Sequence, residues 1–467
     1  MSCHPERSEG PVWVGGAWCV LRATRPHRFL ATLGVTVALS AQTVPDAIIQ
    51  RELASTRAYD TLETLADDIG PRLSGSSGAA AAVKWTTAQF RAWGIPVTNE
   101  TVMVPHWVRG EEHATLPSHR NQTIVLTALG GSVATPAQGI TADIIEVGTY
   151  DELKSKNVRG KIVFYNNPMD MELVRSHRSF EAYRIAVEFR SNGASRAAES
   201  GAVGALIRSV GSASLRTPHT GAMHYDAKVA KIPAAAMTAE DAMLVHRLLA
   251  KGERVRMHLV LTPRTLPDVA SANVIAEVRG SEKPDEIVVL GAHLDSWDLA
   301  TGAIDDGSGV AMVMETMRLL REMKLAPKRT IRAVLFMNEE NGLRGGRAYA
   351  EKHKREHHVA ALETDAGAAA PTGFSTTLKG DALTALEQRT APLAGLGANR
   401  FETSEETGAD IEPLTEAGVP SFGLVPEPLH YFDYHHSPAD TLDKIDPKEL
   451  AQDTAAVAAL TWILANE

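Results

Sequence analysis

Short apolar runs alternate with helical patterns through residues 267–467. Five runs, each bounded by Gly, Asn, Asp or Ser, predict strands at residues 273–278, 286–293, 330–338, 359–365 and 421–425. Apolar residues at helical spacing predict helices at residues 309–323, 343–354 and 451–464. Strands that alternate with helices are typical of an α/β fold: a mixed, mostly parallel sheet flanked by helices on both faces.

The region from residue 42 to residue 120 begins with the same helical periodicity. Ile48, Leu53 and Leu62 mark this pattern. A cluster of turn-forming residues at 70–76, Gly-Pro-Arg-Leu-Ser-Gly-Ser, then precedes a helix predicted at residues 79–93. We interpret residues 42–120 as the N-terminal part of the domain that resumes at residues 266–467.

Residues 121–265 have a different pattern and predict an inserted β-rich domain. Short strand-like runs occur at residues 124–129, 144–147 and 161–165, with one helical piece near residues 194–199. This region contributes no candidate metal ligand. No repeat of 20 to 50 residues is visible in the chain, so a solenoid is not predicted.

Composition favours a globular enzyme. The chain has 467 residues, of which 44% are hydrophobic, so it can bury a large core divided over two or three domains. The formal net charge is −10, and no basic stripe is present that could neutralise phosphates. A general nucleic-acid binder is therefore excluded.

The first 41 residues have the pattern of a secretory signal peptide. Arginines precede an apolar stretch at residues 29–41 that ends in small residues, and about 13 residues are too few to span a bilayer comfortably. The residues before Leu21 have no clear role in this interpretation and read as a leader or a misplaced translation start. We expect export to the periplasm or the extracellular space.

Removal of this segment would remove both cysteines, Cys3 and Cys19, so no disulfide is expected in the mature chain. No later apolar run reaches 18 residues, and the mature form is not expected to enter a membrane.

Candidate chemistry gathers where predicted strands end. His and acidic residues follow the apolar runs in five short segments, at 293–295, 304–306, 338–340, 363–365 and 435–437. In α/β sheets the carboxyl ends of strands supply active-site groups. Imidazole and carboxylate suit Zn²⁺, and no cysteine is nearby to build a closed thiolate site. Each segment alone could be an ordinary turn or helix cap, so only the set predicts a catalytic metal site.

Five candidate ligands, His293, Asp305, Glu340, Asp365 and His436, are too many for one open tetrahedral zinc. They suffice for two ions if one carboxylate bridges them. Asp295, two residues after His293, is the candidate that would orient the imidazole ring. Glu339, beside a ligand, is the candidate general base.

The order of these motifs and the residues in them resemble those of a known family. The chain resembles the zinc-dependent exopeptidases, which include bacterial secreted aminopeptidases and glutamate carboxypeptidases, over roughly residues 57–465. The segments GAHLDSWDLATGAIDDGSG at 291–309 and YFDYHHSPADT at 431–441 are most similar to the carboxypeptidase Q (plasma glutamate carboxypeptidase) branch. The 70–76 loop matches the family as well, and residues 121–265 resemble a protease-associated insert domain.

The resemblance implies roles for the candidate residues. Asp305 would bridge two Zn²⁺ ions, with His293 and Asp365 completing one site and Glu340 and His436 the other. His436 is preferred over His435 because its spacing to the following residues matches the family. The resemblance also implies a cis peptide bond after Asp305. We expect the two ions to hold a bridging water and lower its pKa, while Glu339 takes its proton.

Substrate preference is less well specified. Some aminopeptidase relatives have Gly-Ser-Asp-His in a loop where this chain has Gly-Ala-Asp-Ile, with Ile411 in place of the histidine. The branch favours dipeptides or short peptides with a free terminus, and it is compatible with a homodimer.

Three alternatives stay open: an aminopeptidase with broad N-terminal specificity, a single-zinc glutaminyl cyclase-type acyltransferase, and a receptor-like module without catalysis. Zinc stoichiometry separates the last two from the proposed two-zinc enzyme.

Overall fold

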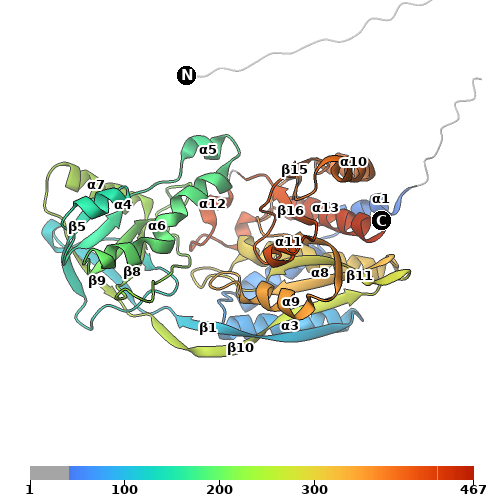
Figure 1. Cartoon of the computed structure of the whole chain (residues 1–467), viewed down its shortest axis with the longest axis horizontal. Coiled ribbons are helices and arrows are strands. Elements are labelled where there is room, and N and C mark those ends of the chain that lie inside the picture. Colours follow the sequence, from blue (N-terminus) through green and yellow to red (C-terminus); the bar gives the residue numbers. More distant parts are fainter. Residues whose placement is uncertain (1–41, 429) are drawn as a thin grey trace, which may run out of the picture. The chain divides into compact units, whose positions relative to one another are not determined.

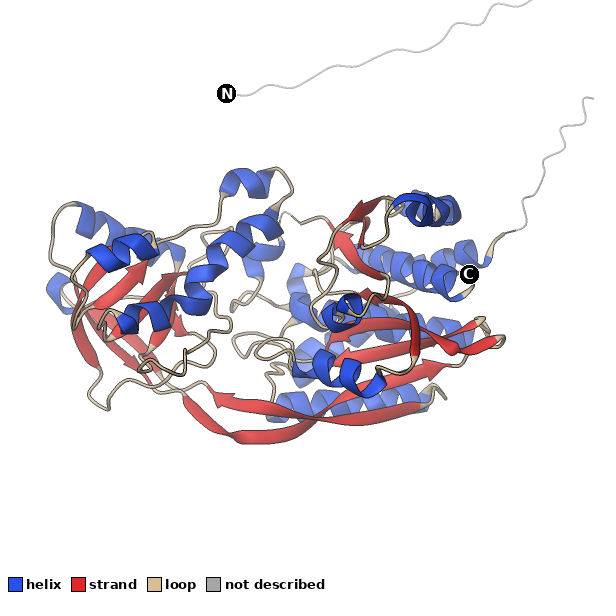
Figure 2. Ribbon diagram, viewed as in Figure 1, coloured by secondary structure: helices blue, strands red, loops and turns tan. Residues whose placement is uncertain are grey.

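The structure, a computed structural model, describes residues 42–428 and 430–467 (Figure 1). The predicted signal segment at residues 1–41 lies outside this part of the chain. Two eight-stranded sheets and their helices make up the described residues (Figure 2), so the fold is α/β as predicted. Within the described ranges, no helix combines the length and the apolar character that crossing a bilayer requires.

The first sheet has the strand order β1-β10-β12-β11-β13-β16-β14-β15. Strands β12, β11, β13 and β16 are parallel neighbours, whereas β1, β10 and β14 join the sheet antiparallel. Each of the five predicted strands overlaps one of these. The bounds are β1 Val97–Val108, β10 Arg264–Val278, β11 Lys283–His293, β12 Arg329–Phe336, β13 His357–Glu363, β14 Pro371–Thr376, β15 Phe401–Thr403 and β16 Ser421–Pro426.

Helices cover both faces of this sheet because its central strands are apolar on both sides. Val288 and Leu290 of β11 face one core, and Val289 between them faces another. The alternation follows the two-residue period of a strand. The first core is shared with α1 Val44–Leu53, α2 Arg57–Glu63, α3 Ser77–Ala92, α8 Ser308–Glu322 and α13 Pro447–Ala465, and the second with α9 Arg344–His353 and α11 Glu412–Glu416.

The second sheet has the order β3-β2-β9-β5-β6-β7-β8-β4. Its strands are β2 Glu112–Leu116, β3 Gln122–Thr123, β4 Leu126–Ala128, β5 Ile140–Val147, β6 Ile162–Tyr165, β7 Gly204–Arg208, β8 Ala234–Met237 and β9 Arg256–Leu261. We call residues 109–263 the second-sheet region. It begins before the predicted domain boundary at residue 121, because β2 pairs with β9. Its identity as a protease-associated domain stays a prediction.

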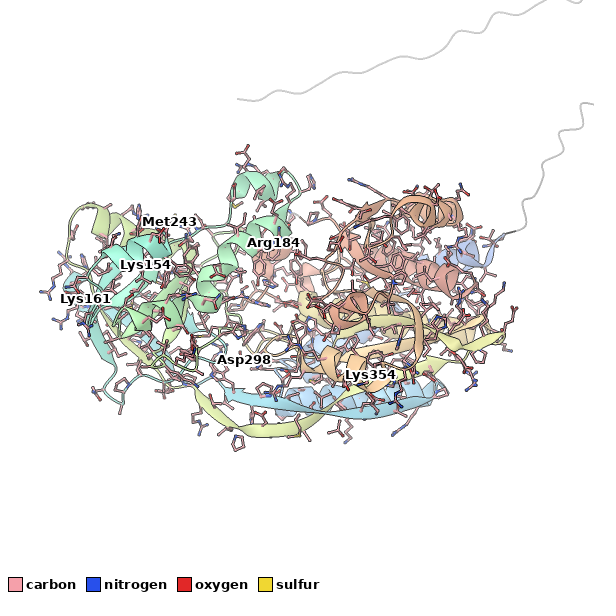
Figure 3. The ribbon with its side chains drawn as sticks, viewed as in Figure 1. Lys154, Lys161, Arg184, Met243, Asp298 and Lys354 are labelled. Atoms are coloured by element: carbon pink, nitrogen blue, oxygen red, sulfur yellow. The ribbon has the colours of Figure 1, made fainter. Side chains whose placement is uncertain are left out.

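The second-sheet region contains more helix than the sequence pattern indicates. Its helices are α4 Tyr150–Ser155, α5 Met171–Arg175, α6 Ser179–Glu199 and α7 Ala239–Ala250, whereas only a piece at residues 194–199 was expected. Most of the side chains that α6 buries are small, including Ala182, Ala186 and Ala194, so its apolar stripe is weak in sequence. Its polar face includes Arg184 (Figure 3), which pairs with Glu406 at 3.1 Å.

A long antiparallel ribbon joins the two regions. β1 and β10 pair from Val97 and Ala276 at one end to Val108 and Arg264 at the other. Only residues 274–278 of β10 also pair with β12, so the ribbon continues past the sheet. The second-sheet region begins and ends at the far end of this ribbon (Figure 1).

Candidate metal centre

Three neighbouring parallel strands deliver four of the predicted residues to one edge of the first sheet. β11 ends at His293, β12 is followed by Glu339 and Glu340, and β13 is followed by Asp365. Since β12, β11 and β13 are adjacent and parallel, their carboxyl ends meet.

Asp305 comes from the irregular turn η3, Ala303–Gly307, directly before α8. Two other carboxylates hold this turn. Asp440 accepts hydrogen bonds from the backbone N–H groups of Ile304 (2.6 Å) and Asp305 (3.3 Å), and Asp306 accepts one from the N–H of His293 (3.1 Å). The peptide bond between Asp305 and Asp306 is cis, as the resemblance implied.

His436 follows the four-residue helix α12, Tyr431–Tyr434, and has a positive φ of 59°. Its ring stacks on that of His435 with 3.5 Å between the centroids and lies 5.8 Å from the ring of Trp297. His435 is buried, and the side chain of His436 is 9% exposed. The residues from 435 to 437 thus place imidazole groups opposite the strand ends.

The five predicted ligands converge around Asp305. Its Oδ1 lies 3.0 Å from His293 Nε2, and its Oδ2 lies 3.1 Å from His436 Nε2. Asp365 Oδ1 lies 3.3 Å from His293 Nε2, and Glu340 Oε2 lies 3.0 Å from His436 Nε2. Asp305 is therefore between two imidazoles, each with a further carboxylate beside it.

Several ligand atoms in this cluster lack ordinary partners. Asp305 Oδ2 and Glu340 Oε2 are buried, and neither makes a hydrogen bond to any described residue, although both are close to His436. His436 Nδ1 has none either. Buried polar atoms normally have partners. Unpaired carboxylate oxygens that face an imidazole form a donor set that fits Zn²⁺.

Electrostatics supports a cation here. Burial, followed by the charge of Asp305, raises the pKa of Glu340 well above its ordinary value. For Asp305, burial alone would raise the pKa, but the hydrogen bond from His293 and the charge of His436 hold it well below its usual range. Burial lowers the pKa of His293, yet Asp365 and Asp305 raise it well above normal. Carboxylates are crowded here, so a bound cation would relieve their mutual repulsion.

Two residues beyond the predicted five also reach the cluster. His435 Nε2 lies 3.5 Å from Asp305 Oδ2, and Asp306 groups with His293 and Asp365 closely enough to share an ion. The sequence analysis preferred His436 as the ligand and left His435 to packing or to support of the metal ligands, and it gave Asp306 no role. Both stand next to a predicted ligand in the sequence, which is the signal that could have identified them.

Asp295 acts on His293 differently from the prediction. His293 Nδ1 is 2.9 Å from the backbone oxygen of Asp295, so the carbonyl, not the carboxylate, accepts its hydrogen bond. The carboxylate instead accepts from the N–H groups of Asn338 (2.7 Å) and Glu339 (3.1 Å) and from the Ser74 hydroxyl (2.9 Å). The expected side-chain role is therefore corrected: the Asp295 carboxylate fixes the loop that carries Glu339 and Glu340.

Glu339 is oriented by its backbone and not by its side chain. Among the described residues, its backbone N–H donates to the Asp295 carboxylate, whereas its own carboxyl group has no hydrogen-bond partner. Burial, followed by the charges of Asp365 and Glu340, raises its pKa well above the ordinary value. A carboxyl group of high proton affinity that lies next to candidate ligands is suited to accept a proton.

Arg72 of the 70–76 loop links two of the backbone segments that form the site. It is fully buried and donates to the carbonyl oxygens of Leu294 (2.9 Å), Thr301 (2.6 Å) and Gly302 (2.9 Å). These carbonyls flank His293 and η3, so Arg72 ties two ligand-bearing segments together. The sequence motif identified the loop but did not predict that Arg72 would link these segments.

A cavity of about 560 Å³ opens beside Asp365 and is lined largely by the loop at residues 404–409 and by β16. Glu363 lies at its base and accepts hydrogen bonds from the N–H groups of Asp410 (3.3 Å) and Ile411 (2.9 Å). Ile411 itself is fully buried in the second core. The position where some aminopeptidases have a histidine thus serves packing here.

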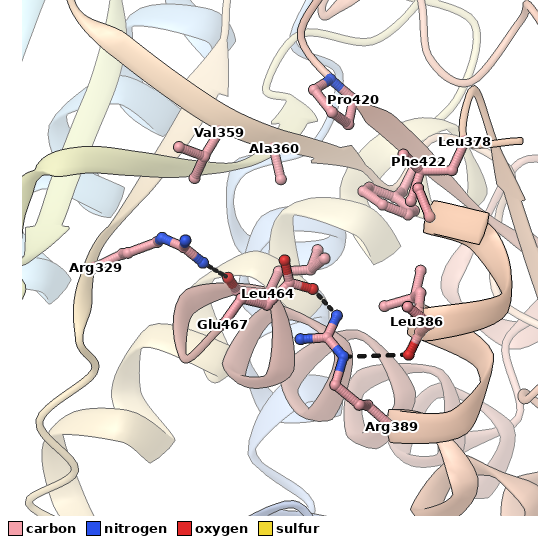
Figure 4. A pocket seen from close by; sticks show the side chains of 12 residues that line it. Arg329, Val359, Ala360, Leu378, Leu386, Arg389, Pro420, Phe422, Leu464 and Glu467 are labelled. Carbon is pink, nitrogen blue, oxygen red and sulfur yellow. Dashed lines mark hydrogen bonds and ion pairs between the residues drawn. The ribbon is translucent and has the colours of Figure 1, made fainter. Parts of the chain in front are cut away.

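A separate cavity of about 540 Å³ lies between β13, α13 and α10, Gly380–Arg389 (Figure 4). Arg389 pairs there with Glu467, and Arg329 donates to the Leu464 carbonyl at 3.1 Å. None of the predicted site residues lines this cavity.

Comparison with known proteins agrees with this geometry. The model of peptidase family M28 matches residues 273–461. Human carboxypeptidase Q is 37% identical over 418 residues, which cover 88% of this chain and 86% of that protein. Aminopeptidase YwaD of Bacillus subtilis is 24% identical and covers 93% of this chain and 90% of its own length.

Solved structures show the same fold. A peptidase M28 precursor from Shewanella amazonensis is 40% identical, with a TM-score of 0.87 over 91% of this chain and 97% of that one. A zinc aminopeptidase from Bacillus subtilis is 22% identical, with a TM-score of 0.65 over 88% and 95%.

Proposed function

The chain belongs to peptidase family M28, and we propose that it is a secreted dinuclear zinc exopeptidase acting on dipeptides or short peptides with a free terminus. Support comes first from the arrangement around Asp305. Each of its two oxygens lies about 3 Å from a different imidazole, at 3.0 Å and 3.1 Å. A carboxylate between two such groups is suited to bridge two metal ions.

His293, Asp365 and Asp305 would hold one Zn²⁺, and Glu340, His436 and Asp305 the other. When bound, the zinc ions would polarise the peptide carbonyl and make an attacking water more acidic. The backbone carbonyl of Asp295 keeps the proton of His293 on Nδ1, which leaves Nε2 available as a ligand.

In this proposal Glu339 handles the proton. Its carboxylate takes a proton from the water that attacks the peptide carbonyl and then gives it to the nitrogen of the leaving amine. The raised pKa of its carboxyl group favours the first of these two transfers. The Asp295 carboxylate keeps Glu339 in place through the hydrogen bond from its N–H.

The test combines zinc analysis with hydrolysis by purified residues 42–467. We expect about two zinc ions per chain and chelator-sensitive release of amino acids from free dipeptides. Asp305→Ala should lose both ions, whereas wild-type protein passed through the same purification should retain them. One ion per chain without release of amino acids would favour the single-zinc acyltransferase, and no ion with no hydrolysis would favour the binding module.

Blocked substrates separate the two kinds of exopeptidase. An N-acetylated dipeptide tests the need for a free amino group, and a dipeptide amide tests the need for a free carboxylate. Cleavage of the amide but not of the acetylated substrate would favour the aminopeptidase alternative, for which the relative in Bacillus subtilis gives a precedent.

Export is the sequence-based part of the proposal. Sequencing the N-terminus of protein recovered outside the cytoplasm should show cleavage near residue 41, whereas an intact N-terminus there would contradict it.

A further inference from the structure

A loop of the second-sheet region reaches the segment that carries His436. This loop, residues 209–220, follows β7 and contacts residues 432–436. Ser212 donates from its N–H to the Phe432 carbonyl (3.0 Å) and from its hydroxyl to Asp433 Oδ1 (2.6 Å). The first contact of the 209–220 loop is therefore with α12.

Its end contacts the two histidines directly. His219 Nδ1 lies 2.7 Å from the carbonyl oxygen of His435, and the N–H of Thr220 donates to the carbonyl oxygen of His436 at 2.8 Å. His219 is buried and its Nδ1 can only donate to a carbonyl. Two consecutive carbonyls of the ligand segment are thus satisfied by the second-sheet region.

The 209–220 loop is itself anchored. The N–H of His219 donates to the Ser209 hydroxyl (2.9 Å), and the Thr220 hydroxyl donates to the Ala128 carbonyl (2.9 Å). Arg190 of α6 donates to the Thr220 carbonyl at 3.4 Å. A Cβ on Gly211 would lie 2.5 Å from His219 Cε1, so the ring fits against bare backbone. These contacts hold His219 in place independently of its contact with His435.

Aromatic side chains of α6 cover the same segment. Tyr183 stacks on Phe432 at 4.6 Å between centroids and meets the His435 ring edge-on at 5.1 Å. Phe180 stacks on Tyr431 at 5.5 Å. The second-sheet region thus contacts α12 and its histidines through both a helix and a loop.

The His436 segment requires such support. His436 has a left-handed φ of 59°, which a non-glycine residue adopts at a cost, and α12 has only four residues. Strands hold His293 in place, but no strand or long helix carries His436. Its Nε2 nevertheless lies within about 3 Å of both Asp305 and Glu340, at 3.1 Å and 3.0 Å.

We propose that His219 is a positioning residue of the metal centre: through the His435 carbonyl it holds His436 at the distance that the second metal ion needs. The inference rests on the proposed function, since it assumes that His436 is a ligand. It gives the second-sheet region a part in building the active site, beyond covering it.

The experiment compares His219→Leu with His219→Asn. Leucine removes the donor at similar volume, whereas the asparagine amide can replace Nδ1 as a donor to the His435 carbonyl. Residual zinc per chain is measured against rising chelator concentration. Partners that orient a ligand typically contribute about 10- to 100-fold to metal affinity. We expect His219→Leu to lose one of two zinc ions at roughly 10-fold less chelator, and His219→Asn to recover most of this loss.

The control is His258→Leu. His258 lies on β9 of the same sheet, where its Nδ1 contacts the Thr141 hydroxyl at 2.8 Å, far along the chain from the 209–220 loop. It should keep wild-type zinc retention. His219→Leu should lower kcat with KM nearly unchanged, because the loop positions a ligand and not the substrate.

The outcomes separate the two levels of the proposal. If wild type binds no zinc, the proposed function itself fails. If wild type holds two ions and His219→Leu holds them equally tightly, only the positioning role is overturned. Thermal unfolding of the metal-free proteins shows whether the variants still fold. Equal destabilisation by the leucine and asparagine variants, together with equal zinc loss in both, would show a purely structural role and overturn the inference.

Discussion

Asp305 has two carboxylate oxygens, and each faces a different histidine. Asp440 accepts hydrogen bonds from the N–H groups of Ile304 and Asp305, so the turn that carries these oxygens is held in place by its backbone. Two acids near Asp305 differ in their hydrogen bonds: the Asp295 carboxylate accepts three, whereas the Glu339 carboxyl group accepts none from the described residues. The Asp295 carboxylate therefore holds the loop in place, whereas the Glu339 carboxyl group is left available for proton transfer.

Glu339→Gln tests this division. The amide cannot take a proton from water, and loss of a general base typically costs about 10²- to 10⁴-fold in rate. We expect kcat on a dipeptide to fall by at least roughly 100-fold, while zinc content stays at the wild-type level. Turnover within a few-fold of wild type would remove Glu339 from the mechanism.

Arg72→Met is expected to destabilise the fold. It leaves the carbonyls of Leu294, Thr301 and Gly302 without their donor in a buried site, and each unsatisfied group costs about 1–3 kcal/mol. Urea denaturation should show a loss of at least about 3 kcal/mol. The matched control is Arg57→Met, which removes an exposed arginine of α2 and should change the free energy of unfolding little.

Individual residues show what sequence could and could not predict. All five predicted ligands converge because each follows an apolar strand or a marked turn, which is local information. The Asp295 carboxylate and Ile411 were harder, because their partners are set by tertiary packing. Asp295 meets Ser74 from a loop 221 positions away, and Ile411 packs into a core formed by several strands. The spacing of residues in the sequence does not predict contacts of this kind.

At the scale of elements, α1 and α8 enclose an acidic pair. Glu52 of α1 is fully buried, and neither of its oxygens makes a hydrogen bond to a described residue. Glu315 of α8 is also buried but is held by Arg318 through two hydrogen bonds of 2.6 Å. Burial, followed by the charge of Glu315, raises the pKa of Glu52 to about 9.

This pair predicts a pH dependence of stability. Glu52 has a higher pKa in the folded than in the unfolded chain, so between its ordinary value of 4.5 and about 9 the folded state binds more protons. Stability therefore falls as pH rises through this range. Glu52→Gln should flatten the decline and be more stable than wild type at pH 8 by at least about 1 kcal/mol.

Denaturation curves at pH 5.5 and pH 8 measure the effect. Glu63→Gln, at an exposed position of α2, should leave the difference between the two pH values as in wild type. A variant at Glu52 with an unchanged pH profile would contradict the prediction.

Elements differ in how visible they are in the sequence. Strands β11, β12 and β13 are continuous apolar runs because both of their faces are buried, and their pattern predicts them well. Helix α6 lies against the second sheet with small side chains and carries many charges, so its pattern revealed only its last turns. An element is therefore easier to predict from the sequence when a wider face of it is buried.

At the scale of the whole molecule, the proposed ions should stabilise the fold. Their ligands come from segments between residues 293 and 436, so the ions bind the folded chain and not the unfolded one. Binding of each ion at 1,000 times its dissociation constant contributes about 4 kcal/mol, so two ions contribute about 8 kcal/mol, which for a chain of this size corresponds to roughly 9 °C in Tm. Chelation should therefore lower Tm by about this amount, and added Zn²⁺ should restore it. Asp305→Ala, without its bridging ligand, should not respond to chelator.

The β1–β10 ribbon has a consequence for the history of such a chain. Val108 and Arg264 are register partners, so the backbone leaves for the second-sheet region and returns from it at one point of a hairpin. An ancestor with a short turn at that point could have acquired 155 or so residues by a single genetic insertion without displacing a catalytic strand. The acquired piece would also have brought the donors that meet the His435 and His436 carbonyls, so the two parts of the chain would be joined at the candidate metal centre as well as at the ribbon.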